Sequence, residues 1–163
     1  MSKPRIVLYD IETSHNLIAA FQLKNQDWIN PENIVQERHL ISASWKLLGE
    51  KTVHAVSLLD DPRRFNKSPH DDTHVLQVLH KVLSEADVIV AHNGDNFDLK
   101  FTEARFLIQG LPPLPPIIKI DTLAAASSLG GSNARFTLLG GSFDGLDIQV
   151  GDEVDVVAGA NVG

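Results

Sequence analysis

Two carboxylates stand at the end of the first apolar segment of the chain, and their spacing suits a metal site. Asp10 and Glu12 follow the run 6–9 and are separated by one residue. In a strand, side chains at i and i+2 project from the same face, so these carboxylates would lie side by side. A hard cation such as Mg²⁺ or Mn²⁺ relieves their repulsion, because it binds carboxylate oxygens and water. The pattern predicts half of a metal site; the alternative is an ordinary Asp/Thr turn that caps the next segment.

A third carboxylate, Asp98, follows a second short apolar segment at 87–91. Between them, residues 92–97 include Gly94 with Asn and Asp neighbours, a composition typical of a turn. From Phe97 onward the apolar residues recur at helical spacing, so Asp98 lies in the first turn of a predicted helix. A carboxylate is favoured there by the helix dipole alone. Because Asp10 and Glu12 already end another strand, we interpret Asp98 as completing a carboxylate cluster.

These residues resemble motifs I and II of the DEDD 3′–5′ exonucleases, the proofreading-type nucleases of the ribonuclease-H-like superfamily. Motif I corresponds to Asp10-x-Glu12-Thr13, and motif II to His92-Asn93-x-x-Asn96-Phe97-Asp98. The resemblance covers roughly residues 4–125. Segment 117–123 also fits the strand and helix start that follow motif II in this family.

The resemblance implies two-metal hydrolysis of phosphodiester bonds, with two Mg²⁺ or Mn²⁺ ions as cofactors. Asp10 would bridge both ions. Glu12 would bind one ion and help to orient the attacking water, and Asp98 would hold the second ion, directly or through water. The implied substrate is the 3′ end of single-stranded nucleic acid, with DNA favoured, and a polymerase or other replication partner is expected.

Four more residues are expected to bind substrate: Thr13, Asn93, Asn96 and Phe97. Asn93 and Asn96 could contact the terminal nucleotide, but shaping the turn is an equal alternative. Phe97 could stack on a base, and packing at the start of the helix is an equal alternative for it.

The third motif of the family is missing. It supplies the fourth acid on a helix, preceded by a Tyr or His, but Tyr9 is the only tyrosine and no histidine follows His92. Residues 130–163 are rich in glycine and lack helical periodicity. They contain nominal substitute acids, none in a helical context: Asp144, Asp147, Asp152 and Asp155. We therefore expect an exonuclease-like domain at 1–129, a divergent tail at 130–163, and impaired activity.

The composition bounds the class of protein. The chain has 163 residues, 43% hydrophobic, which is enough for one domain with a sizeable core. The absence of cysteine excludes disulfides and Cys-based zinc sites. The net charge of −7 argues against coating duplex DNA, yet permits gripping a few nucleotides at one end. No signal peptide is visible, and no apolar run approaches the ~20 residues of a transmembrane helix. The expected location is cytoplasmic, in a host cell if the gene is viral.

The order of elements predicts an α/β fold. Apolar runs indicate strands at about 5–11, 40–47, 52–57, 87–91 and 117–121, and helices at 72–85, 96–109 and 123–129. Residues 14–36 and 60–70 are expected to be loops, the first with a helical turn. Three meandering strands followed by crossovers give a ribonuclease-H-like mixed five-stranded sheet flanked by helices.

Two rival functions share this fold. One is a binding module, catalytically weak or inactive, that holds a DNA end or a polymerase; the missing third motif supports it. The other is a ribonuclease that trims short RNA, since the choice between DNA and RNA rests on contacts to the 2′-hydroxyl. The complete first and second motifs favour the exonuclease.

Overall fold

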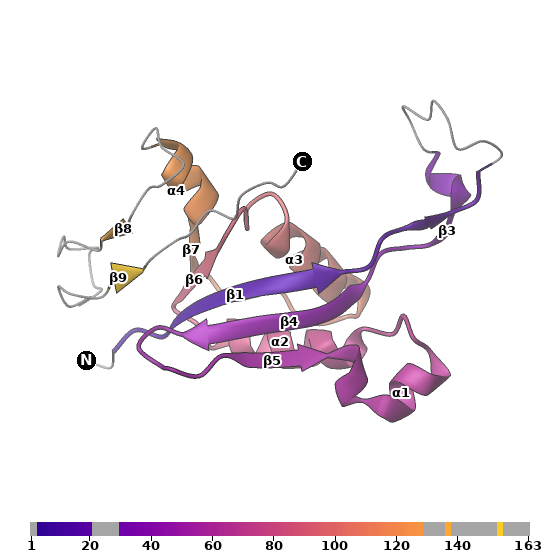
Figure 1. The fold of residues 1–163 in the computed structure, drawn as a ribbon, viewed down its shortest axis with the longest axis horizontal. Helices are drawn as coiled ribbons and strands as arrows, with labels where there is room; N and C mark the ends of the chain where they lie inside the picture. Colours follow the sequence, from indigo (N-terminus) through magenta and orange to yellow (C-terminus); the bar gives the residue numbers. More distant parts are fainter. Residues whose placement is uncertain (1–2, 21–29, 129–135, 138–152, 155–163) are drawn as a thin grey trace.

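A mixed five-stranded sheet forms the centre of the protein. The computed structural model describes residues 3–20, 30–128, 136–137 and 153–154. The strand order is β5-β4-β1-β6-β7 (Figure 1). The strands are β1 (Ile6–Thr13), β4 (Leu40–Leu47), β5 (His54–Ser57), β6 (Val88–Ala91) and β7 (Ile118–Asp121). The β4 strand runs antiparallel to β1 and β5, whereas β6 is parallel to β1 and β7. The predicted sheet is therefore confirmed.

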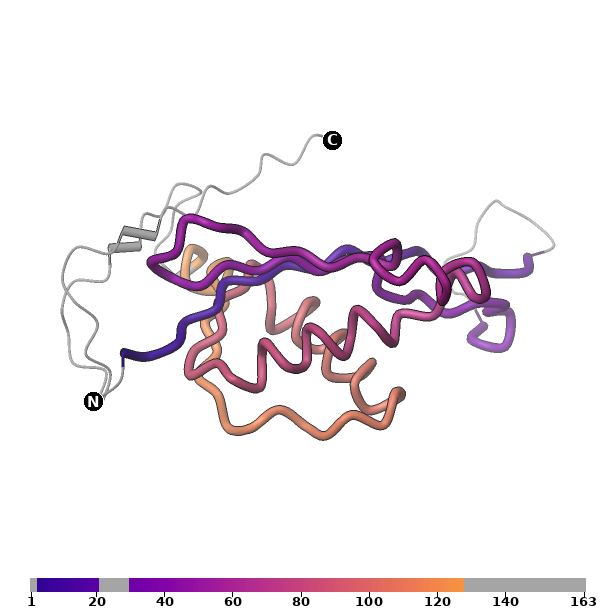
Figure 2. Tube along the Cα trace, turned by 90° about the horizontal axis from the view of Figure 1, so that it is seen from below, coloured from indigo at the N-terminus to yellow at the C-terminus, as the bar shows by residue number. Residues whose placement is uncertain are grey.

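Two helices cover one face of this sheet. They are α2 (Thr73–Ser84) and α3 (Asp98–Ile108), and Figure 2 shows both on the same side of the strands. A shorter helix, α4 (Thr122–Ser128), follows β7. All three were predicted, because their apolar residues recur at helical spacing.

One helix was not predicted. The segment 60–70 was expected to be a loop, but it contains α1 (Pro62–Lys67), preceded by the 3₁₀ helix η2 (Leu58–Asp60). Pro62 occupies the first turn, where its missing N–H costs nothing. The Asp61 carboxylate caps the helix by accepting a hydrogen bond from the Arg64 N–H at 3.0 Å. Capping residues rather than apolar periodicity therefore define this helix.

The excursion after β1 is a short two-stranded ribbon. Its strands, β2 (Leu17–Ile18) and β3 (Ile34–Gln36), pair antiparallel, and the 3₁₀ helix η1 (Pro31–Asn33) supplies the predicted helical turn. Two strands of the C-terminal segment, β8 (Phe136–Thr137) and β9 (Glu153–Val154), also pair antiparallel. The four substitute acids of this segment lie outside the described residues.

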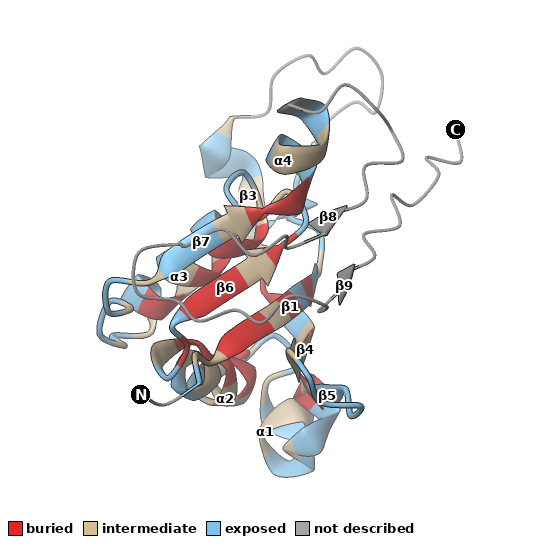
Figure 3. Ribbon diagram, turned by 90° about the vertical axis from the view of Figure 1, so that its left-hand side faces the viewer, coloured by how far each residue is buried: buried red, intermediate tan, exposed pale blue. Residues whose placement is uncertain are grey.

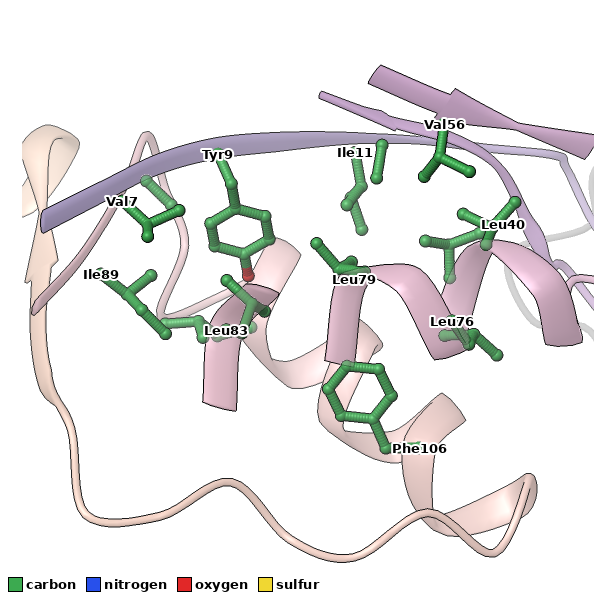
Figure 4. Packing of buried hydrophobic residues seen from close by; sticks show 14 of the residues in the cluster. Val7, Tyr9, Ile11, Leu40, Val56, Leu76, Leu79, Leu83, Ile89 and Phe106 are labelled. Carbon is green, nitrogen blue, oxygen red and sulfur yellow. The ribbon is translucent and has the colours of Figure 1, made fainter. Parts of the chain in front are cut away.

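The core lies between the sheet and its helices. Val7, Tyr9 and Ile11 point from β1 toward α2 and α3 (Figure 4), and all three are buried. In Figure 3, buried residues predominate along β6, whereas along β1 they alternate with intermediate and exposed residues toward its end. Because side chains alternate along a strand, Asp10 and Glu12 project from the opposite face, and both are exposed. The two carboxylates therefore lie on the same face of β1, as their spacing predicted.

A buried ion pair fastens the helices to the sheet. Asp72, fully buried at the start of α2, accepts hydrogen bonds from the Leu40 N–H of β4 and the Arg105 Nε–H of α3, each at 2.9 Å. One carboxylate thus joins three elements that are far apart in the sequence. The desolvation of Asp72 is compensated only while the guanidinium is present.

The variant Arg105→Met tests this junction. It leaves the Asp72 charge buried without its partner, so we expect the free energy of unfolding to fall by ~3–5 kcal/mol in urea denaturation. Lys119→Met is the control, because Lys119 and Glu103 form an exposed ion pair at 2.8 Å. Such pairs contribute ~1 kcal/mol or less. Equal losses in both variants would contradict the assignment of Asp72 as a structural anchor.

Candidate functional site

The candidate site lies where three parallel strands end. Asp10 is in the second half of β1, Asp98 follows the loop after β6, and Asp121 is the last residue of β7. The strands β1, β6 and β7 are neighbours in that order. In open α/β sheets, the carboxyl ends of such strands are where ligand sites form. The topology therefore places carboxylates that are far apart in the sequence on or after neighbouring strands, toward the same edge of the sheet.

The loop from β6 to α3 is tightly folded. Asn93 adopts a positive φ of 60°, and its carbonyl accepts hydrogen bonds from the N–H groups of Asn96 and Phe97 at 3.1 and 3.0 Å. Gly94 is buried, and a Cβ atom there would lie 2.6 Å from the Cβ of Ala91. Only glycine fits this close approach. The loop geometry in turn fixes where Asp98 begins the helix.

Asp121 holds this loop in place. Its carboxylate accepts hydrogen bonds from the N–H groups of Asn93 at 2.9 Å and Asp95 at 3.1 Å. It also caps α4 by accepting from Leu123 at 2.9 Å and Ala124 at 3.3 Å. Burial pushes the pKa of Asp121 upward, but these N–H groups outweigh burial and hold the pKa below its usual range. The charged form is therefore the stable one.

The role of Asp121 was missed in the sequence. A strand ending in Asp-Thr just before a helix was a usable signal, because an Asp in that place commonly caps the helix. The signal gave no hint of the loop after β6, which is distant in the sequence.

Asp98 is buried against the end of β1. The last β1–β6 pair is Leu8 with Val90, so β1 continues past its neighbour. Burial raises the pKa of Asp98, and the charge of Asp10 raises it further. The N–H groups of Asp98 and Ile11 oppose this rise, and the charge of Asp121 adds to it. The charges of Asp98 and Asp10 therefore repel each other at the strand ends, and ionisation of Asp98 lowers the stability of the fold.

This acidic environment suits a cation, although a complete ligand set is not assembled. Within the part of the chain that is described, no group of three or more His, Asp or Glu side chains is close enough to hold a metal ion. Asp98 is 3% exposed, whereas Asp10 and Glu12 are exposed to solvent. The carboxylate chemistry fits Mg²⁺ or Mn²⁺. The predicted site of Asp10, Glu12 and Asp98 therefore stays a prediction.

Tyr9 cannot replace the tyrosine of the missing third motif. It is 5% exposed and faces the helices. Burial raises the pKa of its phenol, and the charge of Asp98 raises it further. The Tyr9 hydroxyl lies near Thr102, yet neither hydroxyl has a partner of good hydrogen-bond geometry among the described residues. Tyr9 is therefore a core residue rather than a proton acceptor.

The residues expected to bind substrate are close to the carboxylates in the sequence, and each has a local structural contact. Thr13 lies at an irregularity in the β1–β4 register, half-buried. The Asn96 amide donates to the Asn93 side chain at 3.1 Å, so both take part in the turn. Phe97 is half-buried, packs against the core and stacks on Phe101 with a centroid distance of 6.2 Å. Their contacts with substrate remain predictions.

The sheet order and its flanking helices define an α/β fold of the ribonuclease-H-like class. Sixty-six chains of solved structures match this fold. One is the family B DNA polymerase from the hyperthermophilic archaeon Pyrobaculum calidifontis, at 13% sequence identity and a TM-score of 0.54. The match covers 85% of this chain and 17% of that polymerase chain. At this identity, the likeness concerns the fold alone.

No family model matches the sequence, and no curated protein matches it. Among the described residues, no helix is both long enough and apolar enough to cross a bilayer.

The variant Asp98→Asn should raise stability at neutral pH in the absence of divalent ions. Because folding raises the pKa of Asp98, stability falls as pH rises through the range between the unfolded and folded values. Asparagine removes that loss. The free energy of unfolding, measured against pH, should exceed that of the natural chain at neutral pH and converge with it below ~3.9, the ordinary Asp pKa. A variant less stable at neutral pH would contradict this account.

The variant Asp121→Asn should have the opposite effect. The lowered pKa of Asp121 contributes stability above the ordinary Asp pKa, and this contribution is lost as pH falls through the lowered value. Asparagine keeps one acceptor oxygen, so some N–H groups lose their partner. We expect a loss of ~1–3 kcal/mol at neutral pH that shrinks in acid. Unchanged stability across the pH range would show that the loop does not depend on this charge.

Proposed function

We propose that this chain is a metal-dependent nuclease domain that shortens single-stranded nucleic acid from its 3′ end, with DNA as the favoured substrate. The observation that carries the proposal is the interaction of Asp10 with Asp98 at the ends of neighbouring parallel strands. Carboxylates brought together at a cost to the fold are typical of functional sites.

The proposed chemistry depends on these side chains. Divalent ions, when bound, would supply an activated water and neutralise the phosphate. Asp10, Glu12 and Asp98 would hold the ions. The raised pKa of Asp98 would fall as a cation offsets the charge of Asp10, so binding and ionisation of Asp98 would be linked. Asn93, Asn96, Phe97 and Thr13 would position the terminal nucleotide.

The fold comparison supports a nucleic-acid context. A family B DNA polymerase shares this fold over 85% of the chain, while the chain spans 17% of that protein. A domain with this fold would act on the end of a nucleic-acid strand or would assist a polymerase. Both possibilities agree with a candidate site at the carboxyl ends of β1 and β6.

A catalytically weak binding module is the second candidate. The observation that favours it is that no three metal-ligating side chains converge within the described ranges. Loss of general-base assistance typically slows a reaction by ~10²–10⁴-fold, so we expect slow hydrolysis at best. Metal binding with strand binding but without hydrolysis would identify this module.

The test is digestion of a 5′-labelled single-stranded oligonucleotide with Mg²⁺ or Mn²⁺. We expect slow, stepwise shortening from the 3′ end, abolished by EDTA and by Asp10→Asn or Asp98→Asn. Mn²⁺ binding, followed by calorimetry, should be lost in the same variants. An RNA oligonucleotide of the same sequence separates the deoxyribonuclease from the ribonuclease.

Asp95→Asn is the matched control. Asp95 is exposed in the same loop, and its backbone N–H, rather than its carboxylate, holds the loop to Asp121. It should retain metal binding and activity. Internal cleavage of a circular strand, or Mn²⁺ binding that survives the loss of both Asp10 and Asp98, would refute the proposed function.

A further inference from the structure

The side chain of one arginine, Arg38, is stacked on two aromatic rings at the start of α3. The guanidinium carbon of Arg38 is 4.7 Å from the ring centre of Phe101 and 5.4 Å from that of Phe97. The two rings are nearly parallel, with an interplanar angle of 12°. Arg38 comes from the connection between β3 and β4, and the rings come from the start of α3. The contact therefore joins two distant parts of the sequence.

The backbone around Arg38 is fixed to the end of β1. The Arg38 N–H donates to the Asn16 side chain at 2.8 Å. The neighbouring His39 accepts a hydrogen bond from the Ser14 N–H at 2.9 Å, and its own N–H donates to the Ser14 hydroxyl at 3.0 Å. Arg38 is thus held beside the residues that follow Glu12 and Thr13.

The same contact joins Arg38 to the residue that precedes Asp98. Phe97, under the guanidinium, is the residue immediately before Asp98. Asp98 in turn interacts with Asp10 and with the Ile11 N–H. Arg38 therefore connects the segment that follows β1 with the start of α3, and these two elements carry the carboxylates; we infer from this that Arg38 lies at the rim of the carboxylate site.

The hydrogen-bonding capacity of this guanidinium is unused within the part of the chain that the structure describes. By contrast, Arg105 is paired with Asp72, and Arg64 with Asp61 and Asp71. In the described ranges, no ion pair or hydrogen bond involves the Arg38 side chain. Stacking occupies the flat face of a guanidinium and leaves its N–H edge available. That edge matches the oxygens of a phosphate.

We propose that Arg38 binds a backbone phosphate of the single strand whose 3′ end enters the carboxylate site. The inference rests on the proposed function and adds a substrate contact to it. A strand approaching Asp10, Glu12 and Asp98 meets negative charge, and the chain carries a net charge of −7. A fixed cation at the rim offsets this repulsion. Stacking on Phe97 and Phe101 holds the guanidinium in place before the strand arrives, which limits the entropy lost on binding.

The test measures strand binding separately from hydrolysis. A 5′-fluorescein oligothymidylate is titrated with the full chain in Ca²⁺ buffer at several salt concentrations, and a gel checks that the strand remains intact. Arg38→Met keeps an apolar side chain over the rings and removes the charge. We expect it to weaken binding about tenfold. The slope of log affinity against log salt should shrink by ~0.7, the value for one phosphate contact on a single strand.

Two further variants make the result specific. Arg38→Lys keeps the charge and should retain the natural salt slope with weaker binding, because it lacks the planar fork. Lys81→Met removes an equal charge from an exposed position on α2 and should change neither quantity. Thermal melts show whether each variant is folded, and comparison of Arg38→Lys with Arg38→Met separates lost charge from lost packing.

The outcomes separate this inference from the proposed function. If Arg38→Met binds as tightly as Lys81→Met does, or if the natural chain does not bind the strand, Arg38 is no phosphate ligand. If Arg38→Met loses affinity and salt dependence while the natural chain never shortens the strand, the inference stands and the nuclease proposal fails. If the natural chain shortens the strand and Arg38→Met binds it as tightly as the natural chain does, the nuclease proposal stands and the inference about Arg38 fails.

Discussion

The carboxylate of Asp121 is the interaction on which the arrangement of the site depends. It accepts N–H groups from the loop after β6 and from the first turn of α4. Neither partner is close to β1 in the sequence, and the loop after β6 leads directly into α3 and Asp98. A charged acceptor is suited to this because hydrogen bonds to an ionised group are stronger than neutral ones. The candidate site is thus positioned by an acid that is not itself a proposed metal ligand.

Two neighbouring aspartates show how environment separates the roles of identical side chains. Asp121 is surrounded by N–H donors, which favour its charge, whereas Asp98 is buried beside the charge of Asp10, which disfavours it. The charge of the first stabilises the fold, and the charge of the second opposes folding. Groups held in the fold against their own charge are enriched at functional sites, which makes Asp98 a candidate for such a site.

The sequence predicted most of the sheet and its helices because apolar periodicity reflects burial directly. It failed at α1, whose ends are set by Asp61 and Pro62 rather than by an apolar stripe. The carboxylates Asp10 and Asp98 were found from strand ends and family motifs. Asp121 and Arg38 were not, since their partners are contributed by distant segments and follow from the packing of β7 against β6 and of β3–β4 against α3. Local patterns carry no such information.

The close approach of Gly94 to Ala91 has a consequence for how this sequence can vary. With only 2.6 Å available between the two Cβ positions, a side chain at 94 would displace the loop or the end of β6. The same space limits growth at 91, which is buried at 4% exposure. Positions 91 and 94 therefore constrain each other, because a larger side chain at either position would clash with the residue at the other. In related chains with this loop, small residues should occur at both places together, whatever chemistry the neighbouring acids perform.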